Sequence, residues 1–126
     1  MSLIFKRRSI RRFTDERVSD EKIESLLKAA MQAPSACNQQ AWEFIVVSKP
    51  EDKLAISQMH DYAKPAEKAS HLIVTIGNLN EAKIHRMIEQ DLGACNENIE
   101  NRYFNTSKRT KKPRDGMAMS SMSIMK

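Results

Sequence analysis

Residues 34–47 read PSACNQQAWEFIVV, a polar segment opened by a proline and followed at once by a short apolar run. The β-branched end of this stretch predicts a short buried strand. In the polar part, Asn38 and Gln40 can each donate and accept hydrogen bonds, as recognition of a heteroaromatic ring requires. Another interpretation is a helix-to-strand connection in which Ser35 and Asn38 satisfy their own backbone and Trp42 fills the core. Taken alone, the segment favours this second interpretation.

Helical and strand patterns alternate on both sides of this segment. Ser19 is a suitable N-cap because two acids follow it, and apolar residues then recur at helical spacing until Pro34 ends the pattern. The other predicted elements are a short opening helix or turn over residues 3–9, a helix from Pro50, a buried strand over residues 72–76 and a helix over residues 81–99. Gly93 lowers the propensity of this last helix, which predicts a close packing contact at that position.

Residues 7–13 read RRSIRRF, so four guanidinium groups surround one hydroxyl. Guanidinium groups pair bidentately with phosphate oxygens, and a serine hydroxyl adds a donor. The candidate phosphate ligands are Arg7, Arg8, Ser9 and Arg11. The spacing alone favours a solvated basic patch, and a membrane surface is less favoured because no apolar helical face accompanies the run.

The composition suits one domain with a modest core. The chain has no apolar run of about 18 residues and no signal-like start, so we expect neither a membrane segment nor secretion. Cys37 and Cys95 lack CxxC spacing and indicate reduced thiols in a cytoplasmic protein, with Cys37 in a packing role. The three histidines, His60, His71 and His85, have no metal-ligand spacing, and His71 is expected to be structural.

The net charge of +5 is unevenly distributed. Residues 1–100 carry 14 Lys and Arg against 15 Asp and Glu, whereas residues 101–126 carry 7 against 1. The body is therefore almost neutral, and its charge does not favour a specific nucleic-acid partner. The basic excess belongs to residues 101–126, where the apolar periodicity also stops and half of the eight methionines gather.

The two segments at residues 7–13 and 34–42, one helix apart and followed by the strand pattern, resemble the N-terminal half of the nitroreductase family. The resemblance implies an α+β fold, a homodimer and FMN at the subunit interface. It also implies electron transfer from NAD(P)H through the flavin to nitro compounds, quinones or similar small-molecule acceptors. The flavin carries such chemistry, so no catalytic side chain is expected.

The resemblance also implies which residues hold the cofactor. In the family, an early R-x-S-x-R segment holds the FMN phosphate, which transfers to Arg7 or Arg8, Ser9 and Arg11. The family's P-S-x-x-N-x-Q-P-W stretch approaches the flavin from the partner subunit. Its matching residues here are Pro34, Ser35, Asn38, Gln40 and Trp42, while Ala41 stands where proline is usual.

The resemblance covers about four-fifths of this chain but only about half of a family domain. We therefore expect a nitroreductase-like portion over residues 1–100 and a basic, disordered tail over residues 101–126, from a truncated or frameshifted reading frame. A one-nucleotide shift permits Asn-Leu-Gly-Met-x-Trp near the end, similar to the segment that follows the third helix in the family. The alternative function is a non-catalytic fragment whose tail binds polyanions non-specifically.

Overall fold

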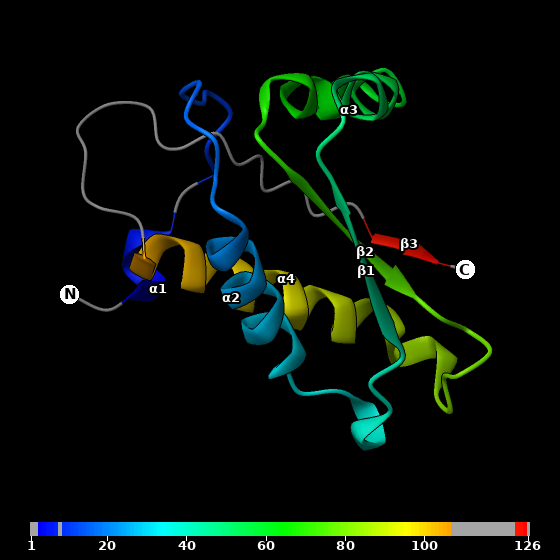
Figure 1. Cartoon of the computed structure of the whole chain (residues 1–126). Helices are drawn as coiled ribbons and strands as arrows, with labels where there is room; N and C mark the ends of the chain where they lie inside the picture. Colours follow the sequence, from blue (N-terminus) through cyan, green and yellow to red (C-terminus); the bar gives the residue numbers. More distant parts are fainter. Residues whose placement is uncertain (1–2, 8, 107–122, 126) are drawn as a thin grey trace.

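The computed structural model describes residues 3–7, 9–106 and 123–125 (Figure 1). In chain order the elements are α1 (Leu3–Lys6), α2 (Asp20–Met31), the 3₁₀ turn η1 (Ala36–Asn38), β1 (Trp42–Val47), α3 (Pro50–Ser57), η2 (Asp61–Lys68), β2 (Leu72–Gly77), η3 (His85–Met87), α4 (Ile88–Thr106) and β3 (Ser123–Met125). Helices combined with a small mixed sheet make an α+β fold, as the sequence predicts.

The first long helix, α2, begins and ends close to where its sequence signals stand. The Ser19 hydroxyl accepts a hydrogen bond from the backbone N–H of Lys22 at 3.3 Å, which satisfies one of the donors left free at a helix start. The helix ends at Met31, shortly before Pro34. The structure thus confirms both the N-cap predicted at Ser19 and the end predicted before Pro34.

The sheet has the order β1-β2-β3, so β2 is its central strand. β1 runs antiparallel to β2, with Trp42 opposite Gly77 and Val47 opposite Leu72. β3 runs parallel to β2 and pairs with its last three residues. Every residue of β2 is buried, which confirms the prediction of a buried strand over this run.

The core lies between the sheet and two helices. α2 packs along α4, and α4 also contacts β2 (Figure 1). The main cluster is apolar and includes Ile23 and Leu26 of α2, Ile73 of β2 and Ile99 of α4. The amphipathic face predicted for α2 thus packs inward, except at Met31, which is 49% exposed.

The expectation that β1 would be a buried strand is wrong. Ile45 is 51% exposed and Val46 is 39% exposed, and the burial of the strand follows no strict alternation. The cause is its position at the edge of the described sheet, where only β2 pairs with it. An edge strand leaves one flank without a neighbouring strand, so a β-branched run alone does not establish burial.

α4 differs from its predicted span at both ends. It begins at Ile88, later than the expected residue 81, because residues 78–82 form a turn in which the Asn78 carbonyl accepts from the backbone N–H of Ala82 at 3.1 Å. The Asn78 side chain also accepts from the backbone N–H of Asn80 at 3.1 Å, an Asx-type contact that competes with helix formation.

The predicted end of this helix, at Ile99, is also wrong. α4 continues to Thr106, and Tyr103 is only 2% exposed and belongs to the main core cluster. The boundary expected at residue 100 therefore falls inside a helix. The expected absence of strand structure after residue 100 fails at Ser123–Met125, which forms β3, whereas residues 107–122 lie outside the described residues.

Gly93 does not mark the close packing contact that its sequence context predicts. A Cβ added at this position would meet no heavy atom within 4 Å, and the residue is exposed. The tight glycine is instead Gly77, at the end of β2, where an added Cβ would lie 2.5 Å from Cγ2 of Ile88. In the part of the chain that the structure describes, no helix has the length and apolar character needed to cross a membrane.

Candidate functional site

The loop between α2 and β1 has an unusual backbone. Cys37, Asn38 and Gln40 all have positive φ values, 51°, 51° and 48°, in the left-handed region that favours glycine. Each such residue costs about 1–3 kcal/mol, and its conformation persists only where contacts in the surrounding structure offset that cost. The loop therefore requires an external anchor to keep this conformation.

Gln39, between these strained residues, supplies that anchor. Its amide oxygen accepts from the backbone N–H groups of Lys83 and Ile84, at 3.0 and 2.9 Å. Its amide nitrogen donates to the carbonyl oxygen of Ile84 at 3.3 Å and to Oδ2 of Asp91 at 2.7 Å. These four contacts use the full hydrogen-bonding capacity of a primary amide.

Asp91 holds the loop at a second point. Its Oδ1 accepts from the backbone N–H of Ala36 at 3.0 Å, and the residue is 7% exposed. Sequence reasoning missed both Gln39 and Asp91 as functional residues. One signal was present: Asp91 lies three residues after Ile88 and four before Cys95, so an acid stands on the apolar stripe of a helix.

Held in this way, the loop presents polar side chains outward. Asn38 and Gln40 are exposed, and neither side chain has a hydrogen-bond partner among residues 3–7, 9–106 and 123–125. Ser35 is different, because its hydroxyl accepts from the backbone N–H of Gln40 at 3.2 Å. The connection interpretation thus holds for Ser35, which closes the loop on itself, and ring binding by Asn38 and Gln40 stays a prediction.

The other residues of this segment differ in their burial. Trp42 is partly buried and packs against the main core cluster, as the connection interpretation predicts. Pro34 is exposed. The packing role expected for Cys37 is wrong, because its thiol is exposed on a left-handed backbone. Cys95 is buried, and burial together with the nearby Asp91 raises its pKa to about 12, so it stays a thiol at neutral pH.

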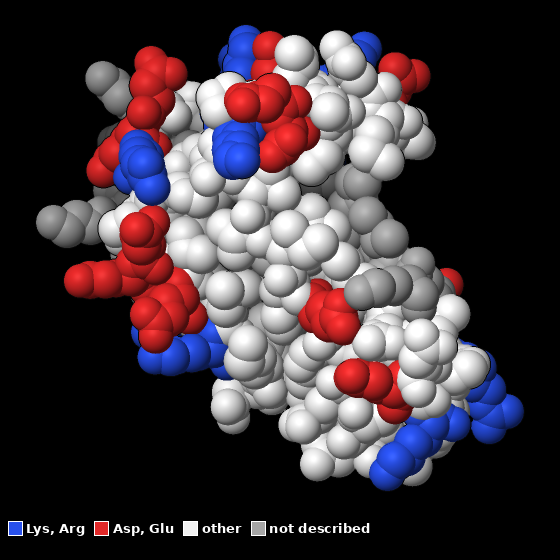
Figure 2. All heavy atoms as spheres, turned by 45° about the vertical axis from the view of Figure 1, so that its right-hand side comes forward, with Lys and Arg blue, Asp and Glu red and all other residues white. Residues whose placement is uncertain are grey.

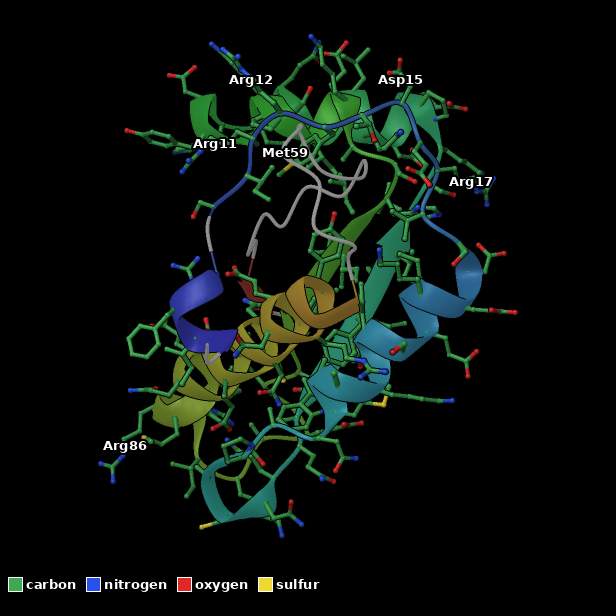
Figure 3. All side chains as sticks on the ribbon, turned by 90° about the vertical axis from the view of Figure 1, so that its left-hand side faces the viewer. Arg11, Arg12, Asp15, Arg17, Met59 and Arg86 are labelled. Atoms are coloured by element: carbon green, nitrogen blue, oxygen red, sulfur yellow. The ribbon has the colours of Figure 1, made fainter. Side chains whose placement is uncertain are left out.

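The predicted phosphate ligands have different surroundings in the part of the chain that the structure describes. Arg7 donates from Nη1 to Oε2 of Glu100 on α4 at 3.0 Å. Arg8 lies outside the described residues, while Ser9 and Arg11 are exposed. Figure 3 shows Arg11 and Arg12 on the stretch of chain that leads toward Asp15 and Arg17. Arg7 is therefore committed in part to joining α1 and α4.

A separate polar cavity of about 280 Å³ lies near the end of η2 and is lined by Thr14, Asp15, Glu16, Arg17, Ser48, Lys53, Lys68, Ala69, Ser70 and His71. Its polar groups mainly serve the fold. The Ser70 hydroxyl accepts from the backbone N–H of Val18 at 2.9 Å and is 2.7 Å from Nδ1 of His71, while Lys53 donates to the carbonyl oxygen of Ala69 at 2.6 Å.

His71 itself is buried, and this burial, followed by the charge of Arg17, lowers its pKa. A neutral imidazole protonated at Nε2 can accept a hydrogen bond from the Ser70 hydroxyl at Nδ1. His71 thus has the structural role that the sequence predicts. Among the described residues, no group of three or more His, Cys, Asp or Glu side chains could hold a metal ion.

Comparisons with known protein sequences and solved structures agree with one another. The model of the family described as "Nitroreductase family" matches residues 4–87. A protein of Archaeoglobus fulgidus, named as a candidate NADH dehydrogenase/NAD(P)H nitroreductase, is 42% identical over 100 residues, which are 79% of this chain and 58% of that protein.

Solved structures show the same likeness in three dimensions. A candidate NADH oxidase from Clostridium acetobutylicum superposes with a TM-score of 0.78 at 46% identity, covering 80% of this chain and 61% of that one. A candidate nitroreductase from Desulfovibrio desulfuricans, solved in complex with FMN, gives 0.75 at 29% identity, covering 82% and 60%. The chain thus spans about three-fifths of the length of each of these three relatives.

Proposed function

This chain belongs to the nitroreductase family, and on that basis we propose that it acts as an FMN-dependent oxidoreductase. It would take electrons from NAD(P)H and pass them to a small-molecule acceptor such as a nitro compound or a quinone. The observation that carries the proposal is the anchored 35–40 loop, which presents Asn38 and Gln40 with their amides available. The FMN complex of a relative with the same fold supports it.

The residues present fit this cofactor. Two exposed amides can donate to and accept from the carbonyl and N–H groups of a flavin ring. Ser9 and Arg11 would hold the phosphate, with Arg8 as a further candidate outside the described residues. Arg7 would contribute less, because it already donates to Glu100. When bound, FMN would supply the redox chemistry, while the protein binds and orients it.

We propose a homodimer as the working assembly. The family resemblance brings the 35–40 loop to a flavin bound by the partner subunit, so a single copy would complete no site. The exposed apolar side chains support this assembly, since Ile4 and Phe5 on α1 and Met31 at the end of α2 are large hydrophobic groups at the surface. A dimer would remove some of this apolar area from water.

A flavin titration of the purified protein tests the proposal directly. We expect an FMN absorbance spectrum, about one FMN per chain after reconstitution, and NAD(P)H consumption that depends on an added quinone or nitroaromatic acceptor. Protein that remains folded but binds no FMN at saturating concentration would contradict the proposed function.

Replacing Arg11 with alanine is expected to weaken FMN binding about tenfold or more. A charge-assisted hydrogen bond contributes about 1.5–3 kcal/mol, and each 1.4 kcal/mol is about a factor of ten in affinity. The control is Arg12→Ala, which removes the same charge from the neighbouring exposed position. Equal FMN affinity in the wild type and Arg11→Ala, measured by fluorescence titration, would remove Arg11 from the site.

The alternative, a non-catalytic fragment that binds polyanions, has less support. Its basic run falls mainly on residues 107–122, outside the part of the chain that the structure describes. On the face shown in Figure 2, lysine and arginine side chains are scattered among aspartate and glutamate rather than gathered into a continuous basic patch. Such a mixture favours no extended anionic partner on this face.

A further inference from the structure

Asp91 is a buried carboxylate whose two oxygens both face the loop that presents Asn38 and Gln40. Oδ1 accepts from the backbone N–H of Ala36 at 3.0 Å, and Oδ2 accepts from the Gln39 amide at 2.7 Å. No salt bridge joins it to a cationic side chain within residues 3–7, 9–106 and 123–125. A buried acid is costly unless hydrogen bonds compensate it, and here both compensating donors come from this loop.

The contacts of Gln39 make this arrangement directional. Because its oxygen already accepts from the backbone N–H groups of Lys83 and Ile84, its nitrogen must face Asp91. A flip of the amide would place oxygen against a carboxylate and nitrogen against two donors. Asp91 and Gln39 therefore fix one conformation of η1 against the segment before α4. In Figure 1, η1 and that segment both lie in the lower part of the view.

The strained residues show why such a fixed conformation is needed. Cys37, Asn38 and Gln40 flank the anchored Gln39, and left-handed backbone persists at non-glycine residues only where neighbouring contacts hold it. We infer that Asp91, acting through Gln39 and Ala36, is a positioning residue that orients the amides of Asn38 and Gln40 for the flavin. This inference rests on the proposed function, because Asp91 itself would touch neither flavin nor substrate.

The test is the variant Asp91→Asn, compared with Glu89→Gln as a matched control. Both changes remove one carboxylate charge from the first turn of α4, but Glu89 is exposed. An asparagine keeps the shape of the side chain and turns one of its two acceptors into a donor, which then meets Ala36 N–H or the Gln39 amide nitrogen. We expect FMN affinity to fall at least tenfold in Asp91→Asn and less than twofold in Glu89→Gln.

Hydrogen exchange of the flavin-free protein provides a readout that does not depend on the cofactor. In Asp91→Asn we expect exchange to quicken severalfold in peptides covering residues 35–42 and 80–86, with residues 72–76 of β2 unchanged. Faster exchange in β2 as well would show a general structural role and overturn the inference. Unchanged exchange in the loop peptides would also overturn it, whether or not FMN binds.

The two proposals fail in different ways. Wild-type protein that binds no FMN contradicts the proposed function, and with it the role toward the flavin. If the wild type binds FMN, and Asp91→Asn loosens the loop yet keeps wild-type affinity, the function stands and the positioning inference fails. Should Asp91→Asn not fold, Gln39→Ala removes the same contact from the loop side, and we expect the same local change in exchange and the same loss of affinity.

Discussion

Replacing Tyr103 with alanine is expected to lower the free energy of unfolding by about 3–5 kcal/mol, the usual cost of truncating a buried aromatic side chain. Tyr103 is 2% exposed and packs in the cluster that joins α2, β2 and α4. Its ring also lies 5.0 Å from Nζ of Lys22 on α2, a cation–π contact. Small domains have only about 5–15 kcal/mol of total stability, so the variant should lose a large share of it.

Tyr103→Phe is the matched control, because it keeps the ring and removes only the hydroxyl. We expect it to lose less than about 1.5 kcal/mol, the range of one hydrogen bond. Urea denaturation followed by circular dichroism measures both variants. A loss below about 1 kcal/mol in Tyr103→Ala would mean that the core ends before this residue, as the sequence pattern indicates, since a buried aromatic cannot be truncated so cheaply.

The same residue shows why the sequence pattern failed here. Charge, methionine content and periodicity all change near residue 100, but each is an average over a stretch of sequence and says little about a single residue. Tyr103 lies four positions after Ile99, at helical spacing, and Phe104 beside it is the only other apolar residue between residues 100 and 106. One residue at helical spacing gives a weak periodic signal, although packing in the main core cluster leaves Tyr103 only 2% exposed.

Other parts of the fold were predictable because their causes are local. The Ser19 cap, the apolar stripe of α2 and the uninterrupted run of β2 each depend on a few neighbouring residues, and the structure confirms them. The exposure of β1 was not predictable in this way. Whether a β-branched strand is central or at an edge depends on the order of strands in the sheet, which its own residues do not encode.

In the candidate site, too, some residues can be predicted from neighbouring sequence, whereas others depend on contacts between distant segments. The motif residues Asn38 and Gln40 can be found from the sequence, because their chemistry and the family spacing lie within nine residues. Their anchor cannot be found so simply, since Gln39 and Asp91 are 52 residues apart and meet only when α4 packs beside the loop. The positive φ values of Cys37 and Gln40 are equally hidden, because neither residue favours that conformation, whereas Asn38 is of a type enriched in it.

Gly77, at the end of β2, and Gly93, in α4, should respond in opposite ways to replacement by alanine. Gly77→Ala is expected to destabilise the protein by about 1–3 kcal/mol, the usual cost of overpacking a core. Its new Cβ would lie 2.5 Å from Cγ2 of Ile88 and 3.4 Å from Cδ1 of Leu92. Cγ2 of a β-branched residue is close to its own backbone, so α4 would have to move away from β2.

Gly93→Ala is the control, because its Cβ would point into open space on α4. Here the helix propensity of alanine should add about 0.5–1 kcal/mol of stability. The reduced entropy of the unfolded chain favours both alanines by about 0.4–1 kcal/mol, so only the contact with Ile88 can produce opposite signs. Thermal unfolding of the two variants side by side decides the matter. A Gly77→Ala protein as stable as the wild type would show that α4 does not approach the end of β2 as closely as the structure places it.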